Sequence, residues 1–78
     1  MSEAPSAALV DARGLRCPWP ALRLARAMRE GAEAIHILAD DPAAAGEFAA
    51  LAEEQGWRIA PMADDRAPAF IVTSPTAP

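Results

Sequence analysis

The only cysteine of the chain, Cys17, lies in the stretch ARGLRCPWP, between an arginine and a Pro-Trp-Pro sequence. A residue before proline is disfavoured in the α region, and proline suits the first position of a helix. The stretch therefore predicts that Cys17 is the N-cap of a helix beginning at Pro18, with Pro20 tolerated in the first turn. The backbone N–H of Trp19 is then the group expected to face the sulfur.

This setting should favour a thiolate at Cys17, because a helix N-terminus is partly positive and Arg13 and Arg16 can add whole charges nearby. A free cysteine has a pKa near 8.5, and such neighbours can lower it to roughly 3.5–7.5. We therefore expect an accessible thiol with a lowered pKa. The alternative is a buried, inert cysteine, since free cysteine is among the most buried residue types.

Several chemistries that use cysteine lack their other groups in this sequence. Nucleophilic hydrolysis needs a base oriented by a third group, and the only histidine, His36, lies in the middle of a predicted strand. One cysteine and one histidine fall short of a zinc site, and no CxxC pair is present. We expect neither a metal nor another cofactor. What remains is a thiol that accepts a group and passes it on, or one that senses oxidants.

The elements that position this cysteine can be read from apolar periodicity and from turn residues. A chain of 78 residues fits one domain. We predict strands at 8–11, 34–39, 57–63 and 67–73, and helices at 18–30 and 42–55. The order β-α-β-α-β-β indicates an α/β two-layer sandwich. Right-handed crossovers would place both helices on one face of a four-stranded mixed sheet and leave the other face largely solvated. The domain should span residues 8–74, with frayed tails at 1–7 and 75–78.

Charge and hydropathy limit the possible partners and location of the protein. The net charge of −4 argues against stable nucleic-acid binding. All seven cations are arginines, and five of them fall within residues 13–29, at Arg13, Arg16, Arg23, Arg26 and Arg29. This region should meet an acidic partner surface, although a solvated helix face is the alternative. No signal peptide or apolar run long enough to cross a bilayer is present, so we expect no membrane association and a cytoplasmic location.

Two further residues have mainly structural interpretations. Gly14 should supply a positive φ or allow a close approach of the loop. Asp41, followed by Pro42, should cap the second helix, and a contact with a partner protein is the minority interpretation.

The stretch LVDARGLRCPWPAL resembles the signature of the TusA/SirA family of small sulfur-carrier proteins, a Cys-Pro-x-Pro motif preceded by Asp-x-x-Gly-Leu. The motif positions are filled by Asp11, Gly14, Leu15, Cys17, Pro18 and Pro20. A second block, ILADDPAAAGEF, is similar to the family's Asp-Pro turn into its second helix, with matches at Asp41 and Pro42 and an acidic residue at Glu47. The resemblance covers about residues 8 to 73. Trp19 departs from it, because small or acidic residues are common in relatives at this position.

The resemblance implies the β-α-β-α-β-β fold and a persulfide carried on Cys17. Sulfur would come from a cysteine desulfurase or another sulfurtransferase and go to an acceptor protein in tRNA thiolation, cofactor synthesis or sulfur oxidation. The protein would be a sulfurtransferase-type carrier rather than a turnover enzyme. For such a carrier, the residues themselves suggest Arg13, Gly14, Arg16, Pro18 and Pro20 as supporting residues and a docking surface that includes Trp19, Arg23 and Asp41. For Trp19, local packing over Pro20 or the sheet edge is the alternative.

Two other functions remain open at this point. The chain could be a non-catalytic interaction or regulatory module whose thiol only caps a helix, or a redox-sensing protein. Serine is at least as good an N-cap as cysteine, so replacing Cys17 by serine would separate the first of these from a carrier.

Overall fold

The computed structural model describes residues 7–75 and shows six elements in the predicted order. They are β1 (Ala8–Asp11), α1 (Trp19–Arg29), β2 (Ala34–Leu38), α2 (Ala44–Gln55), β3 (Arg58–Met62) and β4 (Ala69–Thr73). The predicted fold class is confirmed. Of the predicted tails, residues 1–6 and 76–78 lie outside the described part of the chain.

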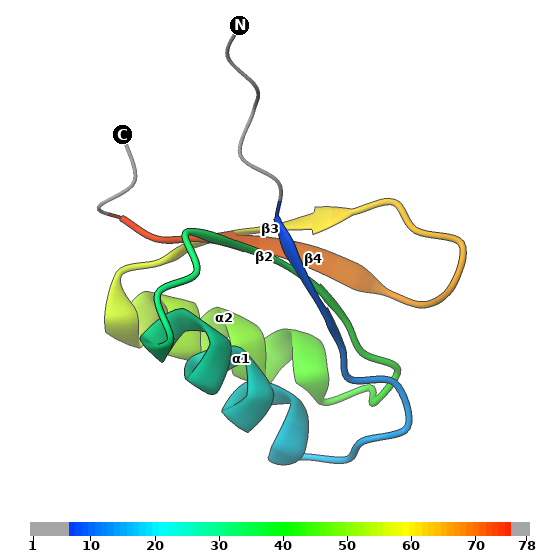
Figure 1. Ribbon diagram of the computed structural model, residues 1–78. Coiled ribbons are helices and arrows are strands. Elements are labelled where there is room, and N and C mark those ends of the chain that lie inside the picture. Colours follow the sequence, from blue (N-terminus) through cyan, green and yellow to red (C-terminus); the bar gives the residue numbers. More distant parts are fainter. Residues whose placement is uncertain (1–6, 76–78) are drawn as a thin grey trace, which may run out of the picture.

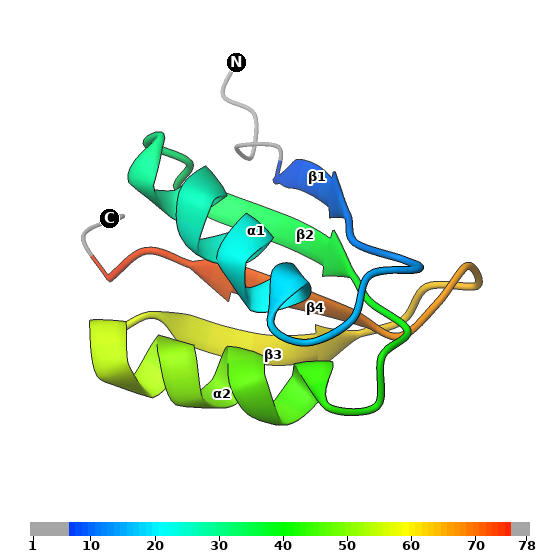
Figure 2. The same cartoon turned by 90° about the horizontal axis from the view of Figure 1, so that it is seen from below.

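The four strands form one mixed sheet in the order β1-β2-β4-β3. β1 pairs with β2 in parallel, whereas β4 runs antiparallel to both of its neighbours, β2 and β3. Both helices cover the same face of this sheet (Figures 1 and 2). Because α1 connects two parallel strands, β1 and β2 end at the same edge of the sheet. The loops that follow these two strands therefore meet at that edge.

The core lies between the sheet and the two helices. Alternate residues of β2, Ile35 and Ile37, point toward the helices and are fully buried, as are Leu24 of α1 and Phe48 of α2. Phe48 also meets Phe70 of β4 edge to face, with the ring centroids 5.5 Å apart and the ring planes 77° from parallel. Phe48 lies in the second turn of α2, so this packing fixes the end of α2 that faces the loops.

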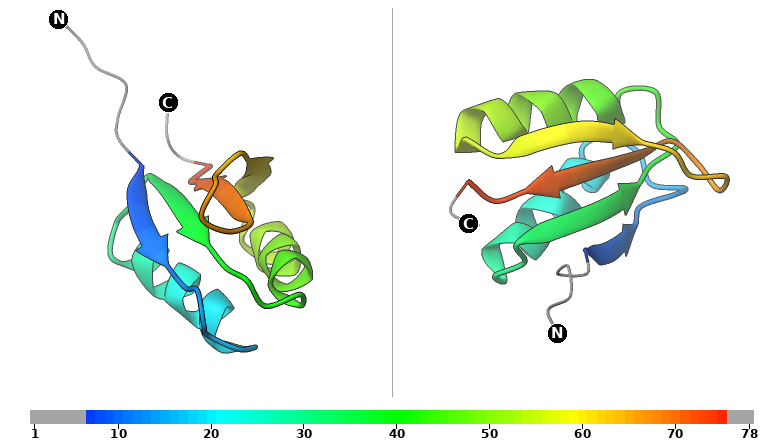
Figure 3. Two further views of the ribbon diagram at one scale, coloured as in Figure 1. Left: turned by 90° about the vertical axis from the view of Figure 1, so that its right-hand side faces the viewer. Right: turned by 90° about the horizontal axis from the view of Figure 1, so that it is seen from above.

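The opposite face of the sheet carries no helix (Figure 3). Arg58 is exposed on this face, in line with the predicted solvation, and Leu9 is exposed there as well. It is not solvated throughout, because Asp64, from the loop after β3, lies over β2. Its Oδ2 atom is 3.1 Å from Nε2 of His36, and its side chain is only 7% exposed. His36 therefore lies against Asp64 on the sheet face, on an element that does not carry the cysteine.

The second helix begins later than the sequence predicts. Regular helix starts at Ala44, two residues after Pro42, and residues 42–43 form a turn. The carboxylate of Asp41 accepts a hydrogen bond from the N–H of Ala43 (3.0 Å), so Asp41 caps this turn instead of occupying the N-cap of the helix. The helix ends as predicted at Gly56, whose φ is 77°.

Candidate functional site

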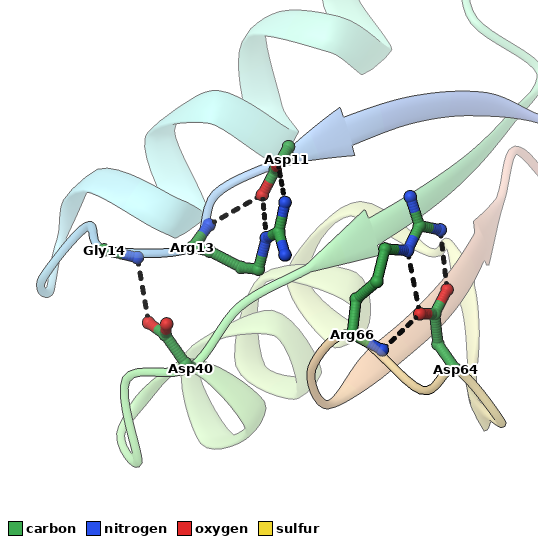
Figure 4. A network of polar contacts seen from close by, with 6 residues as sticks. All are labelled: Asp11, Arg13, Gly14, Asp40, Asp64 and Arg66. Atoms are coloured by element: carbon green, nitrogen blue, oxygen red, sulfur yellow. Dashed lines mark hydrogen bonds and ion pairs between the residues drawn. The ribbon is translucent and has the colours of Figure 1, made fainter.

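The loop between β1 and α1 is tied to the loop between β2 and α2 by two carboxylates. Asp40 accepts a hydrogen bond from the backbone N–H of Gly14 (2.9 Å; Figure 4). Its neighbour Asp41 accepts one from the backbone N–H of Cys17 (2.6 Å). Asp41 thus uses its two oxygens on two loops, because its other oxygen binds Ala43. The position of Cys17 is therefore set by a residue 24 positions later in the chain.

Gly14 makes the turn that brings the first loop into this position. Its φ is 81°, a left-handed conformation that residues with a Cβ adopt at a cost. A Cβ added at Gly14 would meet no atom within 4 Å, so the loop makes no close approach there. Of the two predicted reasons for this glycine, the positive φ is the one that the structure supports.

Cys17 is exposed and is not in a disulfide, which excludes the buried, inert alternative. Its thiol donates a hydrogen bond to Oε2 of Glu47, in the first turn of α2. This bond, followed by partial desolvation and by the negative charges of Glu47 and Asp41, raises the pKa of the Cys17 thiol. The predicted lowering of that pKa is wrong. The reason is that the carboxylate of Glu47 in α2 contacts the sulfur and the negative charge of Asp41 in the other loop acts on it, and each disfavours a thiolate.

The predicted cap at the start of the first helix is also wrong by one residue. α1 begins at Trp19, the cap position is occupied by Pro18, and no side chain caps the helix. The backbone N–H of Trp19 donates to the carbonyl oxygen of Arg16 (2.8 Å) and therefore does not face the sulfur. Pro20 is buried and anchors this turn against the core. Cys17 consequently lies just outside the helix, where its side chain reaches Glu47.

The two arginines predicted to favour a thiolate do not act on the sulfur. The guanidinium of Arg13 binds the carboxylate of Asp11 through Nε (2.8 Å) and Nη2 (2.7 Å), as Figure 4 shows. This pairing lowers the pKa of Asp11 to about 2. The charge of Arg16 contributes to lowering the pKa of Asp41 and has no resolved effect on Cys17. Arg13 and Arg16 are close to Cys17 in the sequence, but in the folded protein their charges act on Asp11 and Asp41.

A cleft of about 270 Å³ opens beside these two loops. It is lined by Gly14, Leu15, Arg16, Asp40, Asp41 and Pro42. The walls carry both signs of charge, and the cleft adjoins the residue that holds the backbone of Cys17. Its place at the carboxyl ends of parallel strands is the common location of functional sites in open α/β sheets.

The start of α1 presents an exposed surface next to the cysteine. The side chains of Trp19 and Leu22 are 58% and 50% exposed, and Arg23 is exposed beside them. Trp19 therefore does not pack into the core of its own domain. Farther along the helix, Arg26 pairs with Glu30 (Nε to Oε2, 3.2 Å). Within residues 7–75, no carboxylate oxygen lies within 4 Å of a guanidinium nitrogen of Arg23, which is the arginine beside Trp19.

Sequence reasoning missed two residues that define this site, Asp40 and Glu47. Asp40 precedes the predicted cap, and Glu47 was noted only as an acidic position of the second block. The predicted topology could have indicated both residues. It places the block ILADDPAAAGEF, which contains Asp40 and Glu47, beside the loop that carries Cys17. Within residues 7–75, no group of three or more histidine, cysteine or acidic side chains is placed to hold a metal ion.

Comparison with known proteins supports the resemblance seen in the sequence. Residues 8–73 match the model of a family described as Sulfurtransferase TusA. The chain belongs to the TusA family. A curated relative from Archaeoglobus fulgidus, named as a candidate sulfur carrier protein, is 47% identical over 52 residues, which cover 64% of this chain and 68% of the relative. These findings support a sulfur-carrier role with donor and acceptor partners.

A solved structure supports the fold of this TusA family member. The crystal structure of the SirA-like protein from Desulfitobacterium hafniense superposes with a TM-score of 0.70 at 24% identity, and the match covers 83% of this chain and 92% of that protein. Neither helix of the described residues is long and apolar enough to cross a membrane.

Proposed function

We propose that Cys17 accepts sulfane sulfur as a persulfide and relays it from a donor protein to an acceptor protein. The observation that carries this proposal is the placement of the chain's only cysteine, exposed at the edge of the sheet and fixed through its backbone by Asp41. Membership of the TusA family supports the same role.

The chemistry is an exchange that needs no external oxidant. The sulfur of Cys17 attacks the terminal sulfur of a donor persulfide, a new S–S bond forms, and the S–S bond of the donor breaks. The Cys17 proton is transferred to the departing donor thiolate, so a thiol and a persulfide exchange places. In delivery an acceptor thiol attacks the terminal sulfur of the Cys17 persulfide, the S–S bond to Cys17 breaks, and the acceptor's proton is transferred to the departing Cys17 thiolate. The protein is accordingly a carrier consumed and regenerated in each round, not a turnover enzyme.

Partner contact is proposed to use the exposed start of α1. Trp19 offers a large exposed aromatic side chain two residues after Cys17. Arg23 adds a positive charge on the same surface and forms no ion pair within residues 7–75. Asp41, at the rim of the cleft, completes the proposed docking surface. The donor is proposed to be a cysteine desulfurase or another sulfurtransferase, and the acceptor a protein of tRNA thiolation, cofactor synthesis or sulfur oxidation, in the cytoplasm.

A redox-sensing role has weaker support. Oxidant sensors depend on a thiol of low pKa, because the thiolate is the form that oxidants attack. The carboxylate of Glu47 raises the pKa of the Cys17 thiol. No second cysteine exists in the chain to resolve a sulfenic acid.

The proposal is tested by intact-mass spectrometry after incubation with a cysteine desulfurase and free cysteine. The wild-type protein should gain the mass of one sulfur atom, and a reductant should remove it. Cys17→Ser should gain none, and its unchanged circular dichroism spectrum would show that it is folded. Absence of any gain with several donor enzymes would refute the carrier function and favour the interaction module.

A further inference from the structure

Glu47 is the only described side chain that bonds the Cys17 thiol, and it does so from an element far away in sequence. Its Oε2 atom accepts the thiol proton, while its Oε1 atom is buried and has no hydrogen-bond partner among the described residues. Phe48, the next residue, is fully buried, so the first turn of α2 has little freedom to withdraw the carboxylate. The contact is therefore built into the core packing of the domain.

The charged groups around this contact are mostly negative. Asp41 binds the backbone N–H of Cys17, and its charge adds to the effect of Glu47 on the thiol. Asp40, on the same loop, accepts a hydrogen bond from Gly14. Arg16 acts on Asp41. In the described range 7–75, no arginine nitrogen lies within 4 Å of a carboxylate oxygen of Glu47 or Asp41. Among the described residues, no cation forms an ion pair with either of the carboxylates that face Cys17, and the charge of Arg16 acts on Asp41 only from beyond 4 Å.

We propose that Glu47 is a positioning residue that keeps the Cys17 thiol protonated in the free protein. A cationic side chain of the donor or acceptor protein then pairs with the Glu47 carboxylate and allows the thiol to lose its proton. The inference rests on the proposed function and specifies how that function is controlled. An unengaged carrier is then a thiol, which is poorly reactive toward oxidants and alkylating agents. Only a partner that brings a positive charge to Glu47 makes the reactive thiolate.

The same carboxylate acts after loading. A persulfide on Cys17 places its terminal sulfur next to Glu47 and Asp41, and its anionic form is repelled by both. Release of the proton and transfer of sulfur are then coupled to one event, the arrival of the partner's cation. During loading the proton leaves Cys17 for the departing donor thiolate, and during delivery a proton from the acceptor thiol returns to the departing Cys17 thiolate. Glu47 therefore begins and ends the cycle as a carboxylate.

The test compares wild type with Glu47→Gln, which preserves the shape of the side chain and removes its charge. Glu54→Gln is the matched control, because it makes the same change of charge on an exposed residue of α2, away from the first turn. Alkylation of Cys17 by iodoacetamide is followed in the free proteins across a pH series. Loading of sulfur is measured in parallel at one pH with a cysteine desulfurase and cysteine. Thermal unfolding monitors whether each variant is folded.

We expect the midpoint of the alkylation profile to fall in Glu47→Gln and its alkylation rate at neutral pH to rise severalfold, with Glu54→Gln equal to wild type. Loading by the desulfurase should rise much less, so the ratio of loading to alkylation falls severalfold. An unmoved midpoint would overturn the proposal, and so would loading and alkylation that rise in equal proportion. Failure of the carrier function itself would appear differently, as no sulfur gain in any protein, while the alkylation midpoints would still report on Glu47.

Discussion

The same substitution, glycine to alanine, should change stability in opposite directions at two positions of this domain. Gly14 has a φ of 81° in the loop that carries Cys17, whereas Gly46 lies in the first turn of α2 and has no positive φ. At both positions an added Cβ would meet no atom within 4 Å. Steric overlap is therefore absent in both cases, and only the backbone conformation distinguishes them.

The magnitudes follow from that difference. A residue with a Cβ in the left-handed region costs about 1–2 kcal/mol, so Gly14→Ala should lower the free energy of unfolding by that amount. In a helix, alanine in place of glycine reduces the entropy of the unfolded chain, so Gly46→Ala should raise the free energy of unfolding by about 0.4–1 kcal/mol. For a domain of this size each kcal/mol corresponds to a shift in Tm of about 4–8 °C.

The assay is thermal and urea unfolding followed by circular dichroism, with sulfur loading from a cysteine desulfurase as the second measurement. Gly14→Ala should also load sulfur more slowly, because the strained loop ends at Cys17 and the N–H of Gly14 binds Asp40. Gly46→Ala should load like wild type. Shifts of the same sign at the two positions would refute the reasoning, since they would show that the positive φ at Gly14 carries no cost.

Two further predictions concern charges at the site. Hydrogen bonds from the N–H groups of Ala43 and then Cys17 lower the pKa of Asp41. The stability that the Asp41 carboxylate contributes is therefore complete above its ordinary pKa of 3.8 and is lost as the pH falls through the lowered pKa. The difference in free energy of unfolding between wild type and Asp41→Asn should shrink below about pH 4 in acid-unfolding experiments. Arg23→Glu should slow loading from a cysteine desulfurase and reduce the dependence of the loading rate on salt. The control Arg58→Glu, on the uncovered face of the sheet, should leave the loading rate and its salt dependence unchanged. Equal effects of the two variants would contradict docking at α1.

Much of the fold follows from local patterns in the sequence. The β-branched run AIHIL and the glycines Gly31 and Gly56 mark the central strand and the ends of both helices, because these signals act within a few residues. The handedness of the crossovers then places both helices on one face without any knowledge of side-chain packing. The start of α2 was predicted two residues early, since Asp41 uses one oxygen on Cys17 and the other on Ala43.

By itself, the sequence determined that the chain carries one thiol, placed between a strand and a helix and matching the TusA signature. Only the tertiary structure decided the electrostatic state of that thiol. Arg16 adjoins Cys17 in sequence and acts on Asp41, while Glu47, 30 positions away, bonds the sulfur. The physical reason is that a pKa depends on distances in space, which the packing of α2 against the sheet sets and no local pattern contains.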